Sequence, residues 1–367
     1  MKNIIYNILY IFILYFYRSH FSPSMIIFIE GFSGKKIVLT DLNKYKYFYH
    51  IKAYFLDKTQ YCYCTFIYND KEIKDIEKII NYKYKEIIVI KINIYNYKLK
   101  DWIDINKLDW NELSRNELAL YLLENNPEKI DWVTLSSNLN AIHLLEKNID
   151  KINWEWLSSN QNAIHILEKN IYNKIDWFSL SLNPNAIRIL ENNLDKINWY
   201  ALSKNPNAIN ILKNNIDKIN WFWLSTNPNA ISILENNLDK IYWPYLSENL
   251  NAINILEKNI DKINWLHLSD NPNAIKILNN NIDKINWEYL STNPKAMHIL
   301  EQNQDKINWC QLSENINAIY MLEQNQHKIE WNLLSKNPNA LKILEQNQDK
   351  IDWYQLSINP SIFESNN

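Results

Sequence analysis

Apolar residues recur with a fixed period over most of the chain, and each period contains one tryptophan at the same place. The spacing is 22 residues, with one 23-residue step caused by an extra residue around Tyr172–Asn173. We call this tryptophan the register Trp and number the places of each copy from it. A short, fixed period is typical of a solenoid, whose units bury their apolar faces only by stacking on one another. The register residues are Trp110, Trp132, Trp154, Trp177, Trp199, Trp221, Trp243, Trp265, Trp287, Trp309, Trp331 and Trp353.

The copies share some places and vary at others. All twelve have Leu at the fourth place, Ser at the fifth and Asn at the seventh, as in Leu224, Ser225 and Asn227. The eleven complete copies also share Ala at the tenth place, Leu at the fourteenth and Asn at the seventeenth, as in Ala230, Leu234 and Asn237. We expect these places and Trp221 to form the core, with Ala where helices approach closely.

Helix signals divide each copy in two. Asn227 is followed by Pro228, as in most copies, which predicts an N-cap with Pro at the first helical position. Asn237 suits the left-handed residue that ends a helix. The residue before the register Trp is Asp or Asn in ten of twelve copies, a second N-cap that would start a very short helix. Each copy therefore predicts two brief helices and two turns.

A leucine-rich β solenoid is the main alternative, because its repeat length overlaps this one. That repeat needs Leu-x-Leu before its Asn, whereas this chain has Leu-Ser-x-Asn. We therefore favour an α-solenoid of about eleven short repeats over residues 98–367. The repeat resembles the WxxLSxNPNAIxLLExNxDKI arrays encoded by giant DNA viruses related to mimivirus, and the match covers Trp110 to Pro360. The resemblance implies no established activity.

Residues 1–24 form an apolar leader. Its apolar run, Ile4 to Tyr17, is short for a membrane span and resembles a signal-peptide core, without a clear cleavage site. Either the leader targets or anchors the chain, or translation starts at Met25. Contact with a membrane is expected only if the leader is retained.

Residues 25–97 read differently. The runs MIIFIEG and KKIVLTD are joined by GFSG, which predicts a hairpin. An amphipathic stretch, NKYKYFYHIKAYFLDK, and the strands CTFIYND and EIIVIKI follow, with KEIKD between those two strands. This order resembles the ubiquitin-like β-grasp, so the expected class is α+β overall.

The resemblance to the β-grasp has two departures. No Gly-Gly tail follows the last strand, so conjugation is not expected. The family's hydrophobic patch maps to Phe32 and Ile67, but Lys91 stands where the family has an apolar residue. The domain is therefore either an adaptor to ubiquitin machinery or a folded cap.

Charge separates the same two parts. Residues 1–100 hold 16 Lys and Arg against 8 Asp and Glu, and residues 101–367 hold 23 against 33. An acidic array is a poor partner for nucleic acid, because phosphate contacts need Lys and Arg. The three cysteines form neither a disulfide framework nor a zinc pattern, which indicates a reducing, cytosol-like compartment.

Repetition also argues against catalysis. His143, His165 and His298 share the twelfth place, and neighbouring copies of one place lie about 10 Å apart in a stacked solenoid, too far to chelate one metal ion. The Asp239–Lys240 pair recurs in most copies and is expected to be a turn cap and solvated charge. A catalytic group normally occupies one singular pocket. We expect no enzyme activity, no metal and no cofactor.

The second, third, sixth and twelfth places vary, and variation on a rigid repeat is how solenoids present different chemistry. Aromatic residues are enriched there and either anchor a protein partner or pack against the next repeat. They are Trp156, Phe178, Tyr200, Phe222, Trp223, Tyr245, His267, Tyr289 and Tyr354. We expect a scaffold for host or viral proteins in infected cytoplasm, the alternatives being a membrane-tethered or virion protein and the ubiquitin adaptor.

Overall fold

The computed structural model describes residues 26–30, 36–39, 63–68, 71–72, 86–92, 97–170 and 174–365. The chain separates into two compact units, one of residues 1–51 and 65–91 and the other of residues 52–64 and 92–367. The expected leader, the GFSG turn with Phe32 and the amphipathic stretch after it lie outside the described residues. No helix within the described residues is long and apolar enough to cross a membrane.

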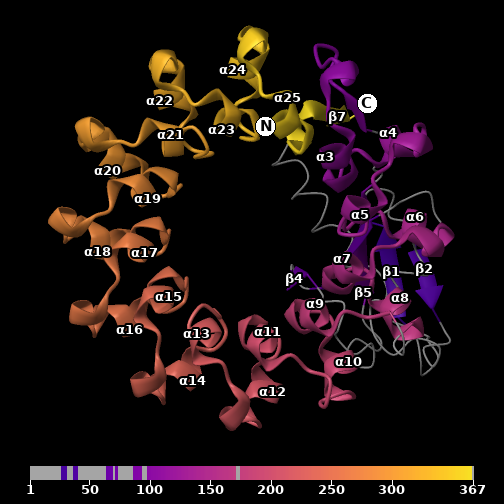
Figure 1. The fold of residues 1–367 in the computed structure, drawn as a ribbon, viewed down its shortest axis with the longest axis horizontal. Helices are drawn as coiled ribbons and strands as arrows, with labels where there is room; N and C mark the ends of the chain where they lie inside the picture. The colour runs from indigo at the N-terminus through magenta and orange to yellow at the C-terminus, as the bar shows by residue number, and fades with distance from the viewer. Residues whose placement is uncertain are drawn as a thin grey trace. The chain divides into compact units, whose positions relative to one another are not determined.

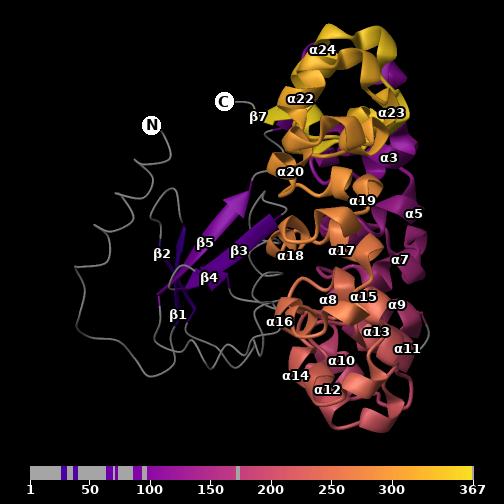
Figure 2. The ribbon, with the colours of Figure 1, turned by 90° about the vertical axis from the view of Figure 1, so that its left-hand side faces the viewer.

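The N-terminal strands form a sheet whose order is β2-β1-β5-β3-β4 (Figure 2). Strand β1 pairs antiparallel with β2 and parallel with β5. The four expected strand segments are confirmed, and the KEIKD segment adds a two-residue strand, β4, antiparallel to β3. The bounds are β1 Ile26–Glu30, β2 Lys36–Leu39, β3 Tyr63–Tyr68, β4 Lys71–Glu72 and β5 Glu86–Ile92.

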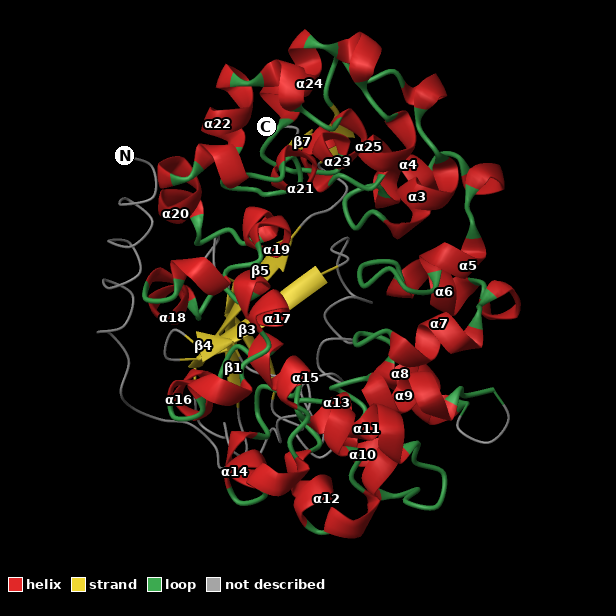
Figure 3. Ribbon diagram, turned by 60° about the vertical axis from the view of Figure 1, so that its left-hand side comes forward, coloured by secondary structure: helices red, strands yellow, loops and turns green. Residues whose placement is uncertain are grey.

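The repeat region consists of short helices joined by loops, as Figure 3 shows, and two α-helices per complete copy are confirmed. The first helix starts at the register Trp and lies on the inner side of a ring, so we call it the inner helix (Figure 1). The inner helices are α3 Trp110–Arg115, α5 Trp132–Leu135, α7 Trp154–Ser159, α9 Trp177–Leu182, α11 Trp199–Lys204, α13 Trp221–Leu224, α15 Trp243–Glu248, α17 Trp265–Asp270, α19 Trp287–Thr292, α21 Trp309–Leu312, α23 Trp331–Ser335 and α25 Trp353–Ser357.

The second helix of each copy lies on the outer side of the ring (Figure 1). The outer helices are α4 Leu120–Glu124, α6 Ile142–Lys147, α8 Ile164–Lys169, α10 Ile187–Glu191, α12 Ile209–Lys213, α14 Ile231–Glu235, α16 Ile253–Glu257, α18 Ile275–Asn279, α20 Met297–Gln302, α22 Ile319–Gln324 and α24 Leu341–Gln346. In most copies a 3₁₀ turn that ends at a Lys follows the outer helix. These turns are η6 Pro127–Lys129, η7 Ile149–Lys151, η8 Ile216–Lys218, η9 Leu238–Lys240, η10 Ile260–Lys262, η11 Ile282–Lys284, η12 Gln304–Lys306, η13 Gln326–Lys328 and η14 Gln348–Lys350, and a similar turn, η5 Ile105–Lys107, precedes the first copy.

The array of repeats closes into a ring, which the repeat pattern did not predict. Helix α25 packs against α3, as neighbouring inner helices pack elsewhere. In place of an outer helix, the last copy has the 3₁₀ turn η15 (Pro360–Ile362) and the strand β7 (Phe363–Ser365). Strand β7 pairs antiparallel with β6 (Tyr97–Leu99), which precedes the first copy. The two ends of the array therefore build the twelfth unit together.

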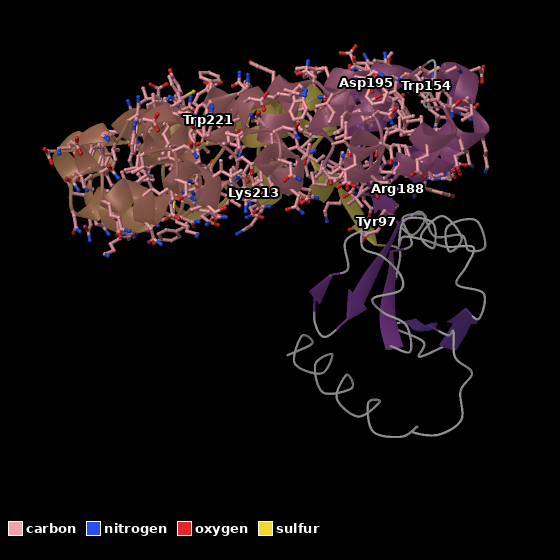
Figure 4. All side chains as sticks on the ribbon, turned by 90° about the horizontal axis from the view of Figure 1, so that it is seen from below. Tyr97, Trp154, Arg188, Asp195, Lys213 and Trp221 are labelled. Carbon is pink, nitrogen blue, oxygen red and sulfur yellow. The ribbon has the colours of Figure 1, made fainter. Side chains whose placement is uncertain are left out.

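The core lies between the inner and outer helices. Leu224, Ala230 and Leu234 are fully buried, as predicted for the fourth, tenth and fourteenth places, and equivalent residues are buried in the other copies. The register Trp residues are half-buried rather than enclosed, so their expected place in the core is only partly correct. Trp154 and Trp221 lie toward one edge of the ring, together with Asp195, whereas Arg188 and Lys213 lie toward the other (Figure 4).

Each register Trp is covered by a lysine. The ammonium of Lys240 lies 4.8 Å from the ring centroid of Trp221, and the twelve equivalent distances range from 4.3 to 5.1 Å. A cation over an indole face is attracted by the ring quadrupole. The Lys of the Asp-Lys pair is therefore not simply a solvated charge, as the sequence analysis expected. This Lys covers the exposed side of the Trp ring.

Candidate protein-binding surface

Buried asparagines hold successive inner helices in register. The Nδ2 group of Asn227 donates to the backbone oxygens of Ser203 (3.1 Å) and Asn205 (2.9 Å) in the preceding copy. Its Oδ1 accepts from the backbone N–H of Asn229 at 3.0 Å. The side chain is fully buried, so these bonds form without competition from water. Equivalent asparagines form a ladder through the ring.

The expected helix N-cap at Asn227 is therefore wrong. The outer helix α14 begins at Ile231, after Ala230, which makes no side-chain capping bond. The short Asx turn at Asn227 keeps its side chain directed at the neighbouring copy instead of at the first turn of a helix. The proline that follows occupies this turn and not the first helical position.

The expected left-handed stop at Asn237 is also wrong. Its φ is −144° and its ψ 52°, and it precedes the 3₁₀ turn η9. Its Nδ2 donates to the backbone oxygen of Ile233 at 2.8 Å, which satisfies a carbonyl at the end of α14. The side chain, rather than the backbone conformation, ends the helix.

The N-cap before the register Trp is confirmed. The Oδ1 of Asn220 accepts from the backbone N–H of Trp223 at 3.0 Å. The fully buried hydroxyl of Ser225 then connects the copies, because it donates to the carbonyl of Trp221 (2.8 Å) and accepts from the N–H of Tyr242 (3.0 Å). Each inner helix is thus fixed to the start of the next, which makes the inner helices a rigid support.

The second, third and sixth places of each inner helix form what we call the inner surface. The fourth and fifth places of the same helix are buried against the core. With 3.6 residues per turn, the second, third and sixth places fall on the opposite side of the helix. Since the core lies toward the outer helices, these variable places are turned toward the inner circumference of the ring.

The structure brings many of the predicted aromatic residues together on the inner surface. Ring centroids are 6.5 Å apart for Phe178 and Tyr200, 5.4 Å for Tyr200 and Trp223, and 5.3 Å for Trp223 and Phe222. We call this group, with its continuation below, the aromatic cluster. Aromatic pairs at 4.5–7 Å stabilise one another beyond the area that they bury.

The aromatic cluster continues into the next two copies. The centroid of Tyr245 lies 4.2 Å from that of Phe222 and 6.0 Å from that of His267. Tyr242 also belongs to it, 4.7 Å from Phe222. The repeat pattern did not single out Tyr242, because its place normally holds the Asp or Asn cap. That departure from the repeat is the signal that would have found it.

Three predicted aromatic residues lie outside the cluster. The ring of Trp156 is 5.8 Å from the guanidinium carbon of Arg115, and the side chain of Tyr289 is partly exposed. The hydroxyl of Tyr354 donates to Glu112 Oε1 at 2.7 Å, and this bond raises the pKa of Tyr354. Tyr354 therefore takes part in closing the ring.

The aromatic residues of the cluster pack against neighbouring copies and are also partly exposed to solvent. Phe222, Trp223 and Tyr245 are half-buried against one another and against neighbouring copies. Phe178 and Tyr200 are each 45% exposed although they also contact their neighbours. Contacts with neighbouring copies hold the aromatic side chains in place along the repeat ring. Faces and edges of these side chains stay open to solvent.

Carboxylates accompany the aromatic cluster. In the copies that start at Trp221, Trp243, Trp265 and Trp287, the inner surface contains three carboxylates and no Lys or Arg. The three are Glu248, Asp270 and Glu288, and all are exposed. Glu248 Oε1 bonds to Nδ1 of His267, and Asp270 Oδ1 accepts from Thr292 Oγ1 at 2.7 Å.

The histidines of the twelfth place each pair with the preceding copy. His143 Nε2 lies 2.7 Å from Glu124 Oε1, and His165 Nε2 lies 2.7 Å from Glu146 Oε1. The hydrogen bond to His165 lowers the pKa of Glu146. His298 Nε2 bonds to the side-chain amide of Asn279 at 3.1 Å. Among the described residues, no three His, Cys, Asp or Glu side chains lie together as metal ligands would.

Of the two residues of the expected β-grasp patch, only Ile67 lies in the described part of the chain. It is in β3 and pairs with Glu72 of β4, while Phe32 lies outside the described residues.

The fold and surface define a closed ring of short helical repeats with an aromatic inner surface. No family model, curated protein or solved structure matches this chain. The resemblance to giant-virus arrays therefore stays a prediction.

Proposed function

We propose that this protein is a non-enzymatic scaffold that binds a protein partner on the inner surface of its repeat ring. The observation that carries the proposal is the aromatic cluster, which is continuous from Phe178 to His267. Aromatic side chains dominate the binding free energy of protein interfaces because they bury large apolar areas and lose little rotamer entropy.

Rigidity supports the same proposal. The inner helices are tied together by the buried Asn and Ser bonds described above, so the aromatic side chains are presented in one arrangement before a partner arrives. Pre-organisation lowers the entropy lost on binding.

A pair of variants tests the proposal. Phe178→Ala with Tyr200→Ala removes two exposed members of the cluster. Tyr121→Ala with Tyr320→Ala is a matched control, since both residues are exposed on outer helices, at 45% and 69%. Affinity purification of the full chain followed by mass spectrometry is expected to recover a partner with the control and to lose it with the cluster variant. Recovery of the same partner by both variants would contradict the proposal.

A second function, as an adaptor to ubiquitin machinery, rests on the N-terminal sheet. We infer a ubiquitin-like β-grasp for residues 25–97, which the strand order β2-β1-β5-β3-β4 and the parallel pairing of β1 with β5 support. Ile67→Ala in the full chain is expected to reduce recovery of ubiquitin-handling proteins. Unchanged recovery would contradict the adaptor function and favour a folded cap.

Viral origin and action in the cytoplasm of an infected cell belong to the proposal as well. The alternative is a membrane-tethered or virion-associated protein. Fractionation of the full chain beside a chain that starts at Met25 separates them. Equal distribution between membrane and supernatant contradicts a tether formed by residues 1–24.

A further inference from the structure

We propose that the partner segment of the inner surface is a cationic, partly apolar polypeptide that lies across the copies from Trp221 to Trp287. This inference rests on the proposed function and names the chemistry of its partner. On the inner-surface places of these four copies, aromatic rings and carboxylates occur together and no Lys or Arg is present, although Lys204 of the preceding copy reaches over Trp223.

The aromatic part selects for apolar and guanidinium groups. Phe222, Trp223 and Tyr245 form the middle of the aromatic cluster, with centroid distances of 4.2 to 5.6 Å. Lys204 already lies over the ring of Trp223 at 4.8 Å, so a cation is accommodated on a face of this cluster. Trp and Tyr faces attract Arg and Lys, and the attraction grows when the pair is shielded from water.

The carboxylates give the surface its charge preference. Glu248 and Asp270 occupy the sixth place of successive copies, and Glu288 occupies the second place of the next one. The bonds of Glu248 to His267 and of Asp270 to Thr292 leave other carboxylate lone pairs available. The nearest inner-surface cations are Lys204 before this stretch and Lys336 after it. An anionic partner would meet repulsion here, and a cationic partner would be attracted.

The order of aromatic side chains and carboxylates along the ring predicts the direction in which the partner segment lies. The aromatic rings are densest in the copies of Trp221 and Trp243, and the carboxylates extend from the copy of Trp243 to that of Trp287. A segment whose apolar residues lie over Phe222 and Tyr245 would therefore place its Lys or Arg residues beside Asp270 and Glu288. Four inner helices at ~8–10 Å spacing are spanned by about 10 extended residues.

Two synthetic peptides test this inference on the full chain. Each has about 12 residues with Trp and Leu in one half, and the other half contains either Arg and Lys or Glu. Fluorescence anisotropy is expected to show binding of the cationic peptide at least tenfold tighter than that of the anionic one, and weaker binding at high salt. Equal affinity for the two peptides would overturn the inference.

Charge variants locate the site. The variant Glu248→Gln with Asp270→Asn and Glu288→Gln is expected to weaken cationic-peptide binding at least tenfold. The control Glu235→Gln with Glu257→Gln and Glu301→Gln changes net charge equally on the outer helices and is expected to leave binding within twofold. An equal loss in both variants would show only attraction to an acidic protein and would contradict the inference.

The outcomes distinguish a wrong partner chemistry from a wrong proposed function. If the anionic peptide binds and Phe222→Ala with Tyr245→Ala abolishes its binding, the inner surface is a binding site and the partner chemistry is wrong. If neither peptide binds and no purified partner depends on the aromatic cluster, both the inference and the proposed function fail.

Discussion

The backbone N–H of Asp109 donates a 2.8 Å hydrogen bond to Oγ of Ser357, which lies 248 residues further along the chain. The same bond joins Tyr242 to Ser225 inside the array, at 3.0 Å. The first described copy therefore follows the last one as any copy follows its predecessor. Closure uses the repeat's own contacts and adds a two-stranded ribbon, β6–β7, in place of an outer helix.

The two serines predict matched losses of stability. Ser357→Ala and Ser225→Ala each leave a part-buried backbone N–H without its acceptor, at a cost of about 1–3 kcal/mol. We expect the two variants to lower the free energy of unfolding by similar amounts in urea titrations. A change within ~0.5 kcal/mol for Ser357→Ala alone, as is usual for a surface substitution, would indicate that the last copy is a free end.

The asparagine ladder predicts a strong contrast between two nearby places. Asn227→Asp keeps the size and the acceptor but loses both Nδ2 donors and directs a carboxylate at two carbonyl oxygens. We expect it to destabilise the ring by about 3 kcal/mol or more. Asn229→Asp removes only the exposed bond to Pro206, 2.9 Å long, and is expected to cost about 1 kcal/mol or less. Equal losses in thermal or urea unfolding would contradict the importance of the buried ladder.

The lysine over each register Trp predicts a smaller, charge-dependent effect. Lys240→Met keeps much of the apolar stem but removes the ammonium over Trp221, with an expected loss of about 0.5–1 kcal/mol. Lys240→Arg should retain most of the stability, because a guanidinium also stacks on indole. If Lys240→Met and the parent protein unfold at the same urea concentration, the contact does not stabilise the fold.

The bond between His165 and Glu146 predicts a pH dependence. It lowers the pKa of Glu146 in the folded state. A lowered carboxyl pKa stabilises the fold fully above the unfolded-state pKa, ~4.3, and the stabilisation is lost as the pH falls from that value through the lower folded-state pKa. The stability difference between the protein and His165→Gln should therefore be largest above about pH 5 and shrink below about pH 4.

His298→Gln is the matched control for this titration, because the partner of His298 is Asn279, which has no proton to gain in this range. Its stability difference from the parent should be constant across the carboxyl range. Urea unfolding at a series of pH values measures both. A constant difference for His165→Gln as well would contradict the stated origin of the pH dependence.

The fold could be predicted from the sequence where one copy determines its own structure. The cap at Asn220 and the buried Leu224, Ala230 and Leu234 depend on contacts that recur at each period, so comparison of copies found them. The interpretations of Asn227 and Asn237 failed because Asn satisfies several local patterns. Only the position of the neighbouring copy decides which pattern forms.

Closure was missed for a different physical reason. A period describes how one copy meets the next, but the small rotation between copies decides whether the array returns to its start, and that rotation is not a sequence pattern. One signal was present. Ile105, Lys107 and Asp109 match the end of a copy, and the repeat pattern stops after Pro360, so the two ends of the array add up to one unit. Lys107 indeed covers Trp353 at 4.9 Å.

The sequence predicted which residue types form the candidate surface but not how far the surface extends. The variable aromatic places were evident from the copies, whereas their continuity from Phe178 to His267 depends on how side chains from neighbouring copies meet. Tyr354 is exposed, as its variable place predicted, and it also bonds to Glu112 across the closure, a contact that no comparison within one copy could find.

A distance between two spin labels tests whether the ring is closed. Asn332 and Asn111 occupy the second place of copies that lie two steps apart across the closure, and Asn111 and Glu155 lie two steps apart within the array. Labels on cysteines at these positions, with the native cysteines replaced, should give similar narrow distances on the order of 20 Å in both pairs. A long, broad distance for Asn332 and Asn111 beside a short one for the control would show an open array and contradict the account.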